Sequence, residues 1–356
     1  MRNSRLGLWI GAAIVLVLLA GGGIAWALRS GSDEPAAAPA PSISVSAEPT
    51  TPAPATTSPA PSPGADITGP LDLLLIGVDT RVSIPDWQPH ADAVMLLHVE
   101  RGLKKAYLYS LPRDLRVSYD GGTHKLTEAM SRGAGDRRDV KKGYELLSRT
   151  ISQYTGIKQF QAGAILNFGG LERLTAQLGG VDLVIDQTVK SRHRKPDGTL
   201  RPLVGGDYVG PQAVYQAGRR HLAGWQAIDY ARQRYGLPNG DYDRQRHQRQ
   251  LVSALFGKAL DRNLADDPAA LEGVLKALGD TLVYLGGRTP IEYAYALRDL
   301  TPQNITRVSL PGDSVLGGGG YLGERLTAEG KGFVTAVAQG KAAGYLAGHP
   351  KLVDKG

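Results

Sequence analysis

The stretch Leu71–Thr80 reads LDLLLIGVDT, a run of large apolar residues that ends in Gly-Val-Asp. A short apolar run closed by turn-forming residues indicates a strand that is buried on both faces. Two later runs have the same character, AVMLLHVE (Ala93–Glu100) and AYLYSLPRD (Ala106–Asp114). We therefore expect these three segments to be strands at the centre of a folded domain that begins near Ile67.

Further strand-like and helix-like segments alternate after this centre. The sequence pattern predicts helices over 143–154, 169–180, 223–235, 242–262, 268–278 and 290–300, and strands over 162–168, 181–185 and 305–310. Strands that alternate with helices predict a layered α/β domain. We place this domain at residues 67–315.

The N-terminal segment predicts a membrane anchor. Residues 6–28 carry no charge, and at about 1.5 Å per residue a helix of this length can cross a hydrocarbon core of about 30 Å. Arg2 and Arg5 precede it, which favours residues 1–5 staying in the cytoplasm. A cleaved signal peptide is the alternative, because Ala25-Trp26-Ala27 resembles a cleavage site. We expect a single-pass protein of the cell membrane with an extracytoplasmic domain.

Two segments outside the domain have a biased composition. Residues 29–66 are rich in Pro, Ala, Ser and Thr, and nine of the 22 prolines of the chain lie between residues 30 and 65. This linker has too few large apolar residues to bury a core, so we expect a disordered tether. Residues 316–356 begin with Gly317–Gly320 and continue rich in Ala and Lys. We expect a flexible loop and a loosely held tail there.

Composition limits the chemistry that the domain can perform. The 356 residues carry a formal net charge of +7 and include no cysteine. The absence of cysteine excludes disulfides, thiolate zinc sites and a cysteine nucleophile. The positive charge favours an acidic partner, such as nucleic acid, phosphorylated lipid or an anionic polymer, without choosing among them.

Acidic and basic residues follow the apolar runs directly. Asp79 and Arg81 come after the first run, and Arg113 and Asp114 come after the third. Asp92 precedes the second run, so an antiparallel pairing of the first two strands would bring Asp79 and Asp92 to one edge of the sheet. Two carboxylates at such an edge are a plausible site for Mg²⁺ or Mn²⁺. The alternative for each Asp alone is a helix cap or a turn.

Five arginines lie within Ala231–Gln250, which reads ARQRYGLPNGDYDRQRHQRQ. Arg232 and Arg234 come at the end of a predicted helix, where the helix dipole also favours cations. The next helix begins near Asp241. At 100° per residue, the polar side chains expected to face inward with the apolar stripe are Asp241, Arg244 and Gln248.

The remaining arginines of this segment fall elsewhere on the helix. Arg246 and Gln250 are expected to point away from the core, and Arg249 lies to the side, so we expect Arg246 and Arg249 to be mainly solvated. A partly buried Arg such as Arg244 needs an anion. A phosphate or pyrophosphate would satisfy it, because guanidinium matches phosphate oxygens bidentately.

Six segments occur in a fixed order over roughly Leu71–Leu255. They are LLLIGVDTR, ADAVMLLHV, LYSLPRDLRV, KLTEAMSRGAG, FQAGAILNFGGLERLTAQLGGVDLVI and HLAGWQAIDYARQRYGLPNGDYDRQRHQRQ. Together they make the chain resemble the LytR-CpsA-Psr family of bacterial cell-envelope proteins. The resemblance implies an α/β/α fold with a central mixed sheet and an apolar pocket for a lipid tail. It also implies transfer of a glycopolymer from a polyprenyl-pyrophosphate carrier to peptidoglycan.

The resemblance also assigns roles to individual residues. It implies that Asp79 and Asp92 hold the divalent metal, Mg²⁺ or Mn²⁺, at the pyrophosphate. The residues implied to bind the pyrophosphate are Arg81, Arg113, Lys125, Arg232, Arg234, Asp241, Arg244 and Gln248. The implied catalytic set is Asp79, Asp92, Arg113, Arg232, Arg234 and Arg244. The family's last motif usually reads Asp-x-x-Arg-x-x-Arg-Gln, and His247 stands here in place of its second Arg.

The implied reaction forms a phosphodiester link between glycopolymer and wall. A sugar hydroxyl of peptidoglycan attacks the phosphorus on the polymer side, and Asp92 or Asp114 takes its proton. A lipid-pyrophosphate hydrolase at the same site is an alternative, in which water replaces the sugar. A non-catalytic wall-binding protein and a transcriptional regulator are further alternatives. We expect no nucleic-acid partner, because only MRNSR would remain inside the cell.

Overall fold

The computed structural model describes residues 63–79, 87–261 and 268–354. The predicted cytoplasmic end, the predicted membrane helix and nearly all of the predicted linker lie outside the described residues. Within those ranges, no helix combines the length and the apolar character that crossing a membrane requires.

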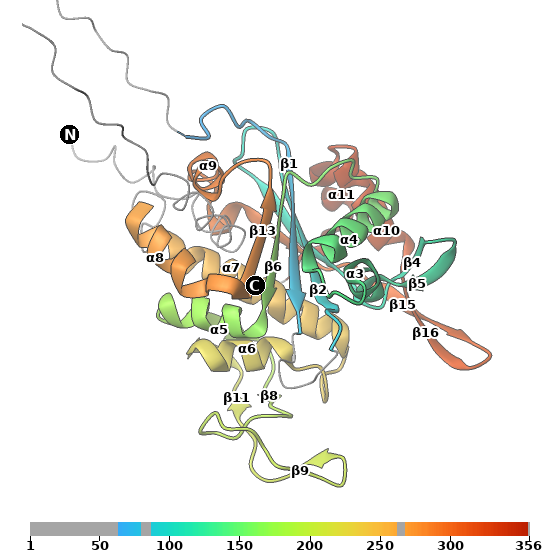
Figure 1. The fold of residues 1–356 in the computed structure, drawn as a ribbon, viewed down its shortest axis with the longest axis vertical. Helices are drawn as coiled ribbons and strands as arrows, with labels where there is room; N and C mark the ends of the chain where they lie inside the picture. Colours follow the sequence, from blue (N-terminus) through green and yellow to red (C-terminus); the bar gives the residue numbers. More distant parts are fainter. Residues whose placement is uncertain (1–62, 80–86, 262–267, 355–356) are drawn as a thin grey trace, which may run out of the picture.

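A mixed six-stranded sheet forms the centre of the fold (Figure 1). In spatial order its strands are β13 (Leu282–Gly286), β6 (Ala162–Asn167), β1 (Leu71–Val78), β2 (Ala91–Val99), β3 (Ala106–Leu111) and β14 (Ile305–Val308). β1 pairs antiparallel with β2 and parallel with β6, and β14 runs parallel to β3. The predicted mixed sheet is therefore confirmed, with the LDLLLIGV run in its interior and with β13 as a strand that the pattern did not indicate.

Helices cover both faces of this sheet, as Figure 1 shows. One face packs against α5 (Phe168–Gln177), α6 (Gly224–Arg232), α7 (Asp241–Asp261), α8 (Pro268–Leu278) and α9 (Pro290–Ala296). The other packs against α3 (Leu126–Ala134), α4 (Val140–Thr155), α10 (Ala328–Ala338) and α11 (Ala342–Gly348). Successive side chains of β1 alternate between the two cores: Leu73 and Leu75 enter the first, and Leu74 and Ile76 enter the second. This alternation explains why β1 is apolar throughout.

Short two-stranded sheets lie outside the central sheet. They pair β4 (Arg116–Tyr119) with β5 (Gly122–Lys125), β7 (Val181–Ile185) with β12 (Gly218–Leu222), β8 (Val189–Lys190) with β11 (Val214–Tyr215), β9 (Leu203–Val204) with β10 (Asp207–Tyr208), and β15 (Gly312–Gly317) with β16 (Gly320–Leu326). Three 3₁₀ turns lie at Gly279–Thr281, Pro302–Asn304 and Pro350–Leu352. Residues 186–217, between β7 and β12, form an arm that projects from one end of the molecule (Figure 1).

The C-terminal segment differs from the sequence prediction. The Gly-rich stretch is the turn of the β15–β16 hairpin, and the expected loose tail folds into α10 and α11. Phe333, Val334 and Val337 are buried in the second core, together with Leu346 and Leu352. The prediction of a loose tail is wrong, because the many Ala, Gly and Lys residues hide a short apolar stripe at helical spacing.

Candidate active site

The carboxyl end of β1 meets the amino end of β2, as the antiparallel prediction required. Val78 pairs with Ala91, so Asp79 and Asp92 lie at the same edge of the sheet. Both carboxylates are largely buried and contact arginines. The residues gathered at this edge, which we call the rim, are Asp79, Asp92, Arg113, Asp114, Lys125, Arg232, Arg234, Asp241 and Arg244. Arg81 lies outside the described residues.

Arg113 is the contact between β3 and the rim. Its Nη1 donates to Asp92 Oδ1, and its Nε lies 3.6 Å from Asp114 Oδ1. Asp114 Oδ2 in turn lies 3.7 Å from Lys125 Nζ. Burial of the Arg113 guanidinium lowers its pKa, but Asp92, Asp114 and Asp241 outweigh burial and raise the pKa overall. Arg113 therefore stays charged next to three carboxylates.

Arg244 reaches the rim from the first turn of α7. Its Nη2 lies 2.7 Å from Asp241 Oδ1 and donates to the backbone oxygen of Asp92 at 3.0 Å. Burial lowers the pKa of Arg244, and the positive charges of Arg113 and Arg234 act in the same direction. Its Nε is buried without a hydrogen-bond partner among the described residues. The prediction that Asp241 and Arg244 share one side of the helix is confirmed.

Arg232 and Arg234 approach the rim from the end of α6. Arg232 is the last residue of α6, and its Nη2 lies 4.0 Å from Asp79 Oδ2. Its guanidinium also stacks over the Phe168 ring, 4.1 Å from the centroid. Arg234 Nη2 donates to the Tyr235 hydroxyl at 3.1 Å, and this bond lowers the pKa of Tyr235, helped by the charges of Arg192 and Arg113. The rim thus contains four arginines: Arg113, Arg232, Arg234 and Arg244.

An apolar cavity of about 50 Å³ opens beside the rim, between the sheet and helices α5, α6 and α7. Its apolar walls include Leu75, Met95, Leu166, Phe168, Ile228 and Leu251. Arg232 and Gln248 supply polar groups to the same cavity. The Oε1 atom of Gln248 is buried and has no hydrogen-bond partner within the described ranges. The cavity is too small for a long lipid chain unless the helices move.

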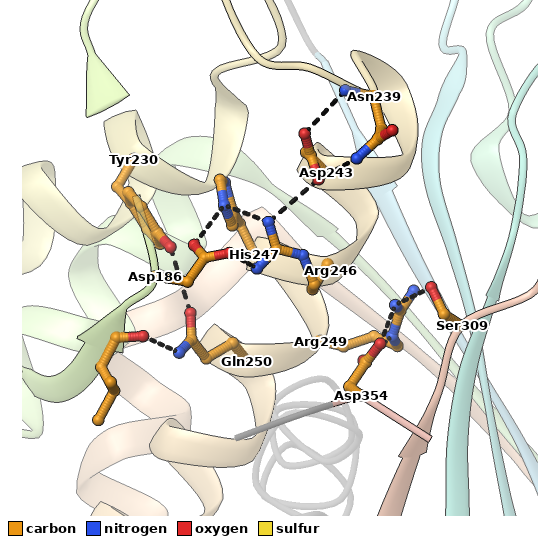
Figure 2. Close-up of polar contacts among 11 residues, drawn as sticks. Asp186, Tyr230, Asn239, Asp243, Arg246, His247, Arg249, Gln250, Ser309 and Asp354 are labelled. Carbon is orange, nitrogen blue, oxygen red and sulfur yellow. Dashed lines mark hydrogen bonds and ion pairs between the residues drawn. The ribbon is translucent and has the colours of Figure 1, made fainter. Parts of the chain in front are cut away.

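Two residues that the sequence predicted to be solvated are paired instead (Figure 2). Arg249 is 1% exposed and binds Asp354 through two bonds of 2.9 and 3.0 Å, with a third bond of 3.1 Å to Ser309. Arg246 is half-buried and bonds to Asp186 and Asp243. The prediction that Arg249 is mainly solvated is wrong, and Arg246 is only partly exposed. A helical wheel of α7 could not show that Asp186 and Asp354, which come from distant segments, pack against these two side chains.

His247 lies on the side of α7 that faces α6. Its ring is fully buried and stacks on Tyr230, with 4.3 Å between centroids (Figure 2). Burial, reinforced by the charge of Arg246, lowers the pKa of His247 to about 4, so the ring is neutral near pH 7. His247 is thus packed between two helices, where it contacts Tyr230, Arg246 and Asp186 and not the arginines of the rim.

Several residues at the rim carried no signal in the sequence analysis. Phe168 lies under Arg232, and Arg192 of the arm stacks over Tyr235 at 4.1 Å. Tyr321 donates to Asp114 Oδ2 at 3.3 Å from the β15–β16 hairpin. Tyr321 is 207 positions away from Asp114 in sequence, so no local pattern could have revealed the contact. The aromatic residue at the end of the predicted strand 162–168, Phe168, is the one signal that was present.

The rim also permits a test of the predicted metal site. No group of three or more His, Asp or Glu side chains in the described part of the chain is arranged to hold a metal. Two carboxylates alone still suit Mg²⁺, which usually keeps waters and takes further ligands from substrate phosphates. The donors at Asp79 and Asp92 therefore fit a cation that arrives with a phosphorylated substrate.

Comparison with known proteins identifies relatives of the chain. The model of the LytR_cpsA_psr family matches residues 41–327. The cell wall biosynthesis protein LcpA of Corynebacterium glutamicum is 26% identical in an alignment of 287 positions that covers 71% of this chain and 52% of LcpA. The polyisoprenyl-teichoic acid–peptidoglycan teichoic acid transferase TagU of Enterococcus faecalis is 28% identical over 216 residues, 60% of each protein. The chain thus spans little more than half of these relatives.

A solved structure supports the same relationship at the level of the fold. TagT bound to LI-WTA superposes with a TM-score of 0.54 at 24% identity. The match covers 77% of this chain and 90% of TagT. At this identity the likeness establishes the α/β fold with its central mixed sheet and nothing finer.

Proposed function

Because the chain belongs to the LytR_cpsA_psr family, we propose that it transfers a glycopolymer from a polyprenyl-pyrophosphate carrier to peptidoglycan. The observation that carries the proposal is the position of Arg232. Its guanidinium contacts Asp79 on the charged rim and Phe168 at the apolar cavity. A molecule that is a pyrophosphate at one end and a hydrocarbon at the other matches this junction. The relative TagU is named as a transferase of this kind.

In this proposal the arginines of the rim hold the pyrophosphate. Its oxygens would be bound by Arg113, Arg232, Arg234 and Arg244. The buried Nε atoms of Arg113 and Arg244 make no hydrogen bond among the described residues, so they can donate to a phosphate without breaking one. By family resemblance Arg81 joins them. Lys125 and Gln248 would complete the polar lining. Guanidinium groups suit this role because they match two phosphate oxygens at once.

Asp79 and Asp92 would hold Mg²⁺ or Mn²⁺. When bound, the cation neutralises charge on the pyrophosphate oxygens. The chain's own residues position the reacting groups, which is the main source of catalysis in phosphoryl transfer. The arginines stabilise the negative charge that develops on the departing polyprenyl phosphate.

The acceptor hydroxyl forms a new oxygen–phosphorus bond to the polymer-side phosphate. The bond between that phosphorus and the bridging oxygen breaks, and polyprenyl phosphate leaves. The hydroxyl proton passes to a carboxylate, with Asp92 and Asp114 as the two candidates. Asp114 lies at the more open part of the rim, in contact with Arg113, Lys125 and Tyr321.

The lipid tail would occupy the apolar cavity. A volume of about 50 Å³ requires α5 and α6 to move away from the sheet when the carrier binds. We further propose that residues 6–28 anchor the protein and that the described domain works outside the cell membrane. A reporter enzyme that works only outside the cytoplasm should then be active when it is fused after residue 356. Activity of a reporter that works only in the cytoplasm would contradict this topology.

The test of the activity uses the full chain with a polyprenyl-pyrophosphate-linked glycan, Mg²⁺ and peptidoglycan. We expect the glycan to become covalently attached through an acid-labile phosphodiester. Chelation of divalent cations and Asp79→Asn should each abolish attachment, and Arg244→Ala should slow it about 10²- to 10³-fold. Arg137→Ala is the matched control, because Arg137 is exposed in the turn after α3, away from the rim.

Omission of peptidoglycan separates the transferase from a hydrolase. A transferase leaves the carrier intact when no acceptor is present. Release of glycan phosphate at the same rate with and without peptidoglycan would identify a hydrolase and overturn the proposal. Unchanged attachment by Asp79→Asn and Arg244→Ala would show that the rim is not the site.

A further inference from the structure

The arm, residues 186–217, leaves the domain beyond the carboxyl end of the central sheet. Figure 1 shows its strands β8 to β11 extending away from the helices and the sheet. The β9–β10 hairpin forms its tip, where Val204 pairs with Asp207 across Gly205 and Gly206. Both glycines have positive φ, 59° and 91°, which a tight hairpin turn requires.

Hydrogen bonds at the base of the arm hold the tip in one orientation. The buried Arg201 guanidinium donates to the backbone oxygens of Arg192, Tyr208 and Gly210 at 2.7 to 3.2 Å. At the foot of the arm, the Tyr215 hydroxyl donates to Asp229 of α6 at 2.7 Å. These bonds fix the direction in which the tip points.

Several aliphatic side chains at the tip are exposed, beside the exposed Asp207, whose Oδ1 lies 3.8 Å from Arg192 Nη2. Leu200, Leu203 and Val204 are 66%, 60% and 61% exposed, and Val209 is exposed as well. Leu203 and Val204 are neighbours on one strand, so they point to opposite faces of the hairpin.

A strand of a soluble domain normally buries one face, whereas this hairpin leaves aliphatic side chains exposed on both faces and half-buries only Tyr208, against His193. The aliphatic side chains of the tip are therefore suited to an apolar environment, and the one carboxylate beside them, Asp207 opposite Val204, is paired with Arg192.

Basic residues surround the foot of the arm. The arm itself, residues 186–217, contains five Lys and Arg against three Asp, a net charge of +2, and Arg219 and Arg220 follow shortly after it. Lys190, Arg219 and Arg220 are exposed, and Arg192 is partly exposed. We call these four residues the basic collar. An aliphatic tip above a basic collar matches the acyl layer and the anionic headgroups of a membrane.

We propose that the arm inserts its aliphatic tip into the membrane surface, with the basic collar against anionic lipid headgroups. A glycan would require several aromatic and amide groups at the tip, whereas the tip has one aromatic side chain, Tyr208, which packs against His193 and Arg192. A second copy of the chain would bring a second basic collar to the same place, where like charges repel. The charge pattern thus favours a lipid surface.

This contact would have a consequence for the rim. Arg192 of the basic collar stacks on Tyr235, which also bonds to Arg234, and the Arg192 backbone nitrogen donates to Gln233 Oε1 at 2.9 Å. A membrane-bound arm would therefore hold the arginines after α6 close to headgroup level. The pyrophosphate of a lipid carrier lies at that level. This consequence, unlike the membrane contact, rests on the proposed function.

The test uses the full chain, which contains no cysteine. The single variants Leu203→Cys and Val204→Cys accept an environment-sensitive fluorophore at the tip. Ile291→Cys is the matched control, because Ile291 is 42% exposed on α9, at the other end of the domain (Figure 1). The labelled proteins are reconstituted into vesicles of phosphatidylcholine and phosphatidylglycerol, with and without nitroxide-labelled lipid.

We expect a blue shift and nitroxide quenching at positions 203 and 204, and neither at position 291. Lys190→Gln or Arg219→Gln should weaken the association of the arm about fivefold per charge removed. No quenching at 203 and 204 in vesicles that contain the protein would overturn the proposal. So would equal quenching at 291, or a vesicle-independent blue shift, which would mean that a second copy covers the tip.

A second measurement separates this inference from the proposed activity. The double variant Leu203→Ser/Val204→Ser should keep its rate on a short-chain carrier dissolved in detergent and lose most of its rate on a carrier embedded in vesicles. Equal rates of the wild type and this variant on both carriers would contradict the arm's role without touching the transferase. Loss of activity on both carriers would count against a role confined to membrane contact.

Discussion

Arg244 and Arg249 lie five residues apart on α7, and both are buried, yet their surroundings differ. Arg249 is satisfied by Asp354 and Ser309 through three bonds. Arg244 shares Asp241 and a backbone oxygen, and its Nε has no hydrogen bond within the described residues. A satisfied arginine holds the fold together, whereas a buried arginine with an unused donor is suited to bind an anion. Within one helix we therefore expect Arg249 to stabilise the fold and Arg244 to bind an anion.

The largest expected effect is on the stability provided by Arg249. Arg249→Ala leaves the Asp354 carboxylate buried without its partner, which should lower the free energy of unfolding by about 3–5 kcal/mol. Chemical denaturation of the full chain measures this. Replacing both partners, as in Arg249→Met with Asp354→Leu, should recover most of the loss. If Arg249→Ala lowers the free energy of unfolding by less than about 1 kcal/mol, the Arg249–Asp354 pair does not stabilise the fold as expected.

The complementary change at Arg244 should affect activity and spare stability. Arg244→Ala removes a donor for the developing phosphate charge, so we expect kcat to fall about 10²- to 10³-fold. The unfolding midpoint should stay near that of the wild type, because the removed cation is incompletely paired. Glycan transfer assays alongside Arg137→Ala measure the difference. If Arg244→Ala destabilises as much as Arg249→Ala, the distinction between the two arginines fails.

His247 extends the comparison to pH. Its pKa is lowered to about 4 in the folded state, against about 6.5 in an unfolded chain. Between these values the unfolded state binds more protons, so stability is full above about pH 6.5 and decreases as the pH falls towards 4, by about 3 kcal/mol in total. His247→Phe should keep the stack on Tyr230 and remove this part of the pH dependence. An identical slope in His247→Phe would assign it to other groups.

The smallest effect is expected at Arg246. Its partner Asp186 is 45% exposed, and ion pairs at such exposed positions contribute about 0–1 kcal/mol. Its other partner, the buried Asp243, also accepts two bonds from Asn239 and keeps them when Arg246 is removed. Arg246→Ala should therefore leave transfer activity unchanged and lower the free energy of unfolding by no more than about 1 kcal/mol. A tenfold loss of activity would show that Arg246 belongs with Arg244 and not with Arg249.

The sequence predicts what depends on local periodicity and strand order. The apolar runs gave the central strands, and the antiparallel pairing of the first two placed Asp79 beside Asp92. The helical wheel placed Arg244 and Gln248 on the inward side of α7. Each of these follows from spacing within one or two adjacent elements.

The sequence could not predict contacts made between distant segments. Arg249 and Asp354 are separated by 105 positions, and the Asp354 segment was expected to be loose. The stacking of Arg232 on Phe168 depends on how α5 and α6 pack side by side. The roles of the rim residues in metal and pyrophosphate binding stay predictions, to be tested by the substitutions above.

The small size of the apolar cavity has a thermodynamic consequence for the proposed carrier. At about 50 Å³ the cavity cannot hold a polyprenyl chain, so the carrier can bind only to molecules in which α6 has moved away from the sheet. In a protein that is mostly closed, the apparent dissociation constant equals the intrinsic one divided by the fraction of open molecules. The free energy of separating α6 from the sheet is then subtracted from the binding free energy of every lipid that enters. Substitutions that weaken the packing of α6 on the sheet would therefore tighten lipid binding without adding a contact.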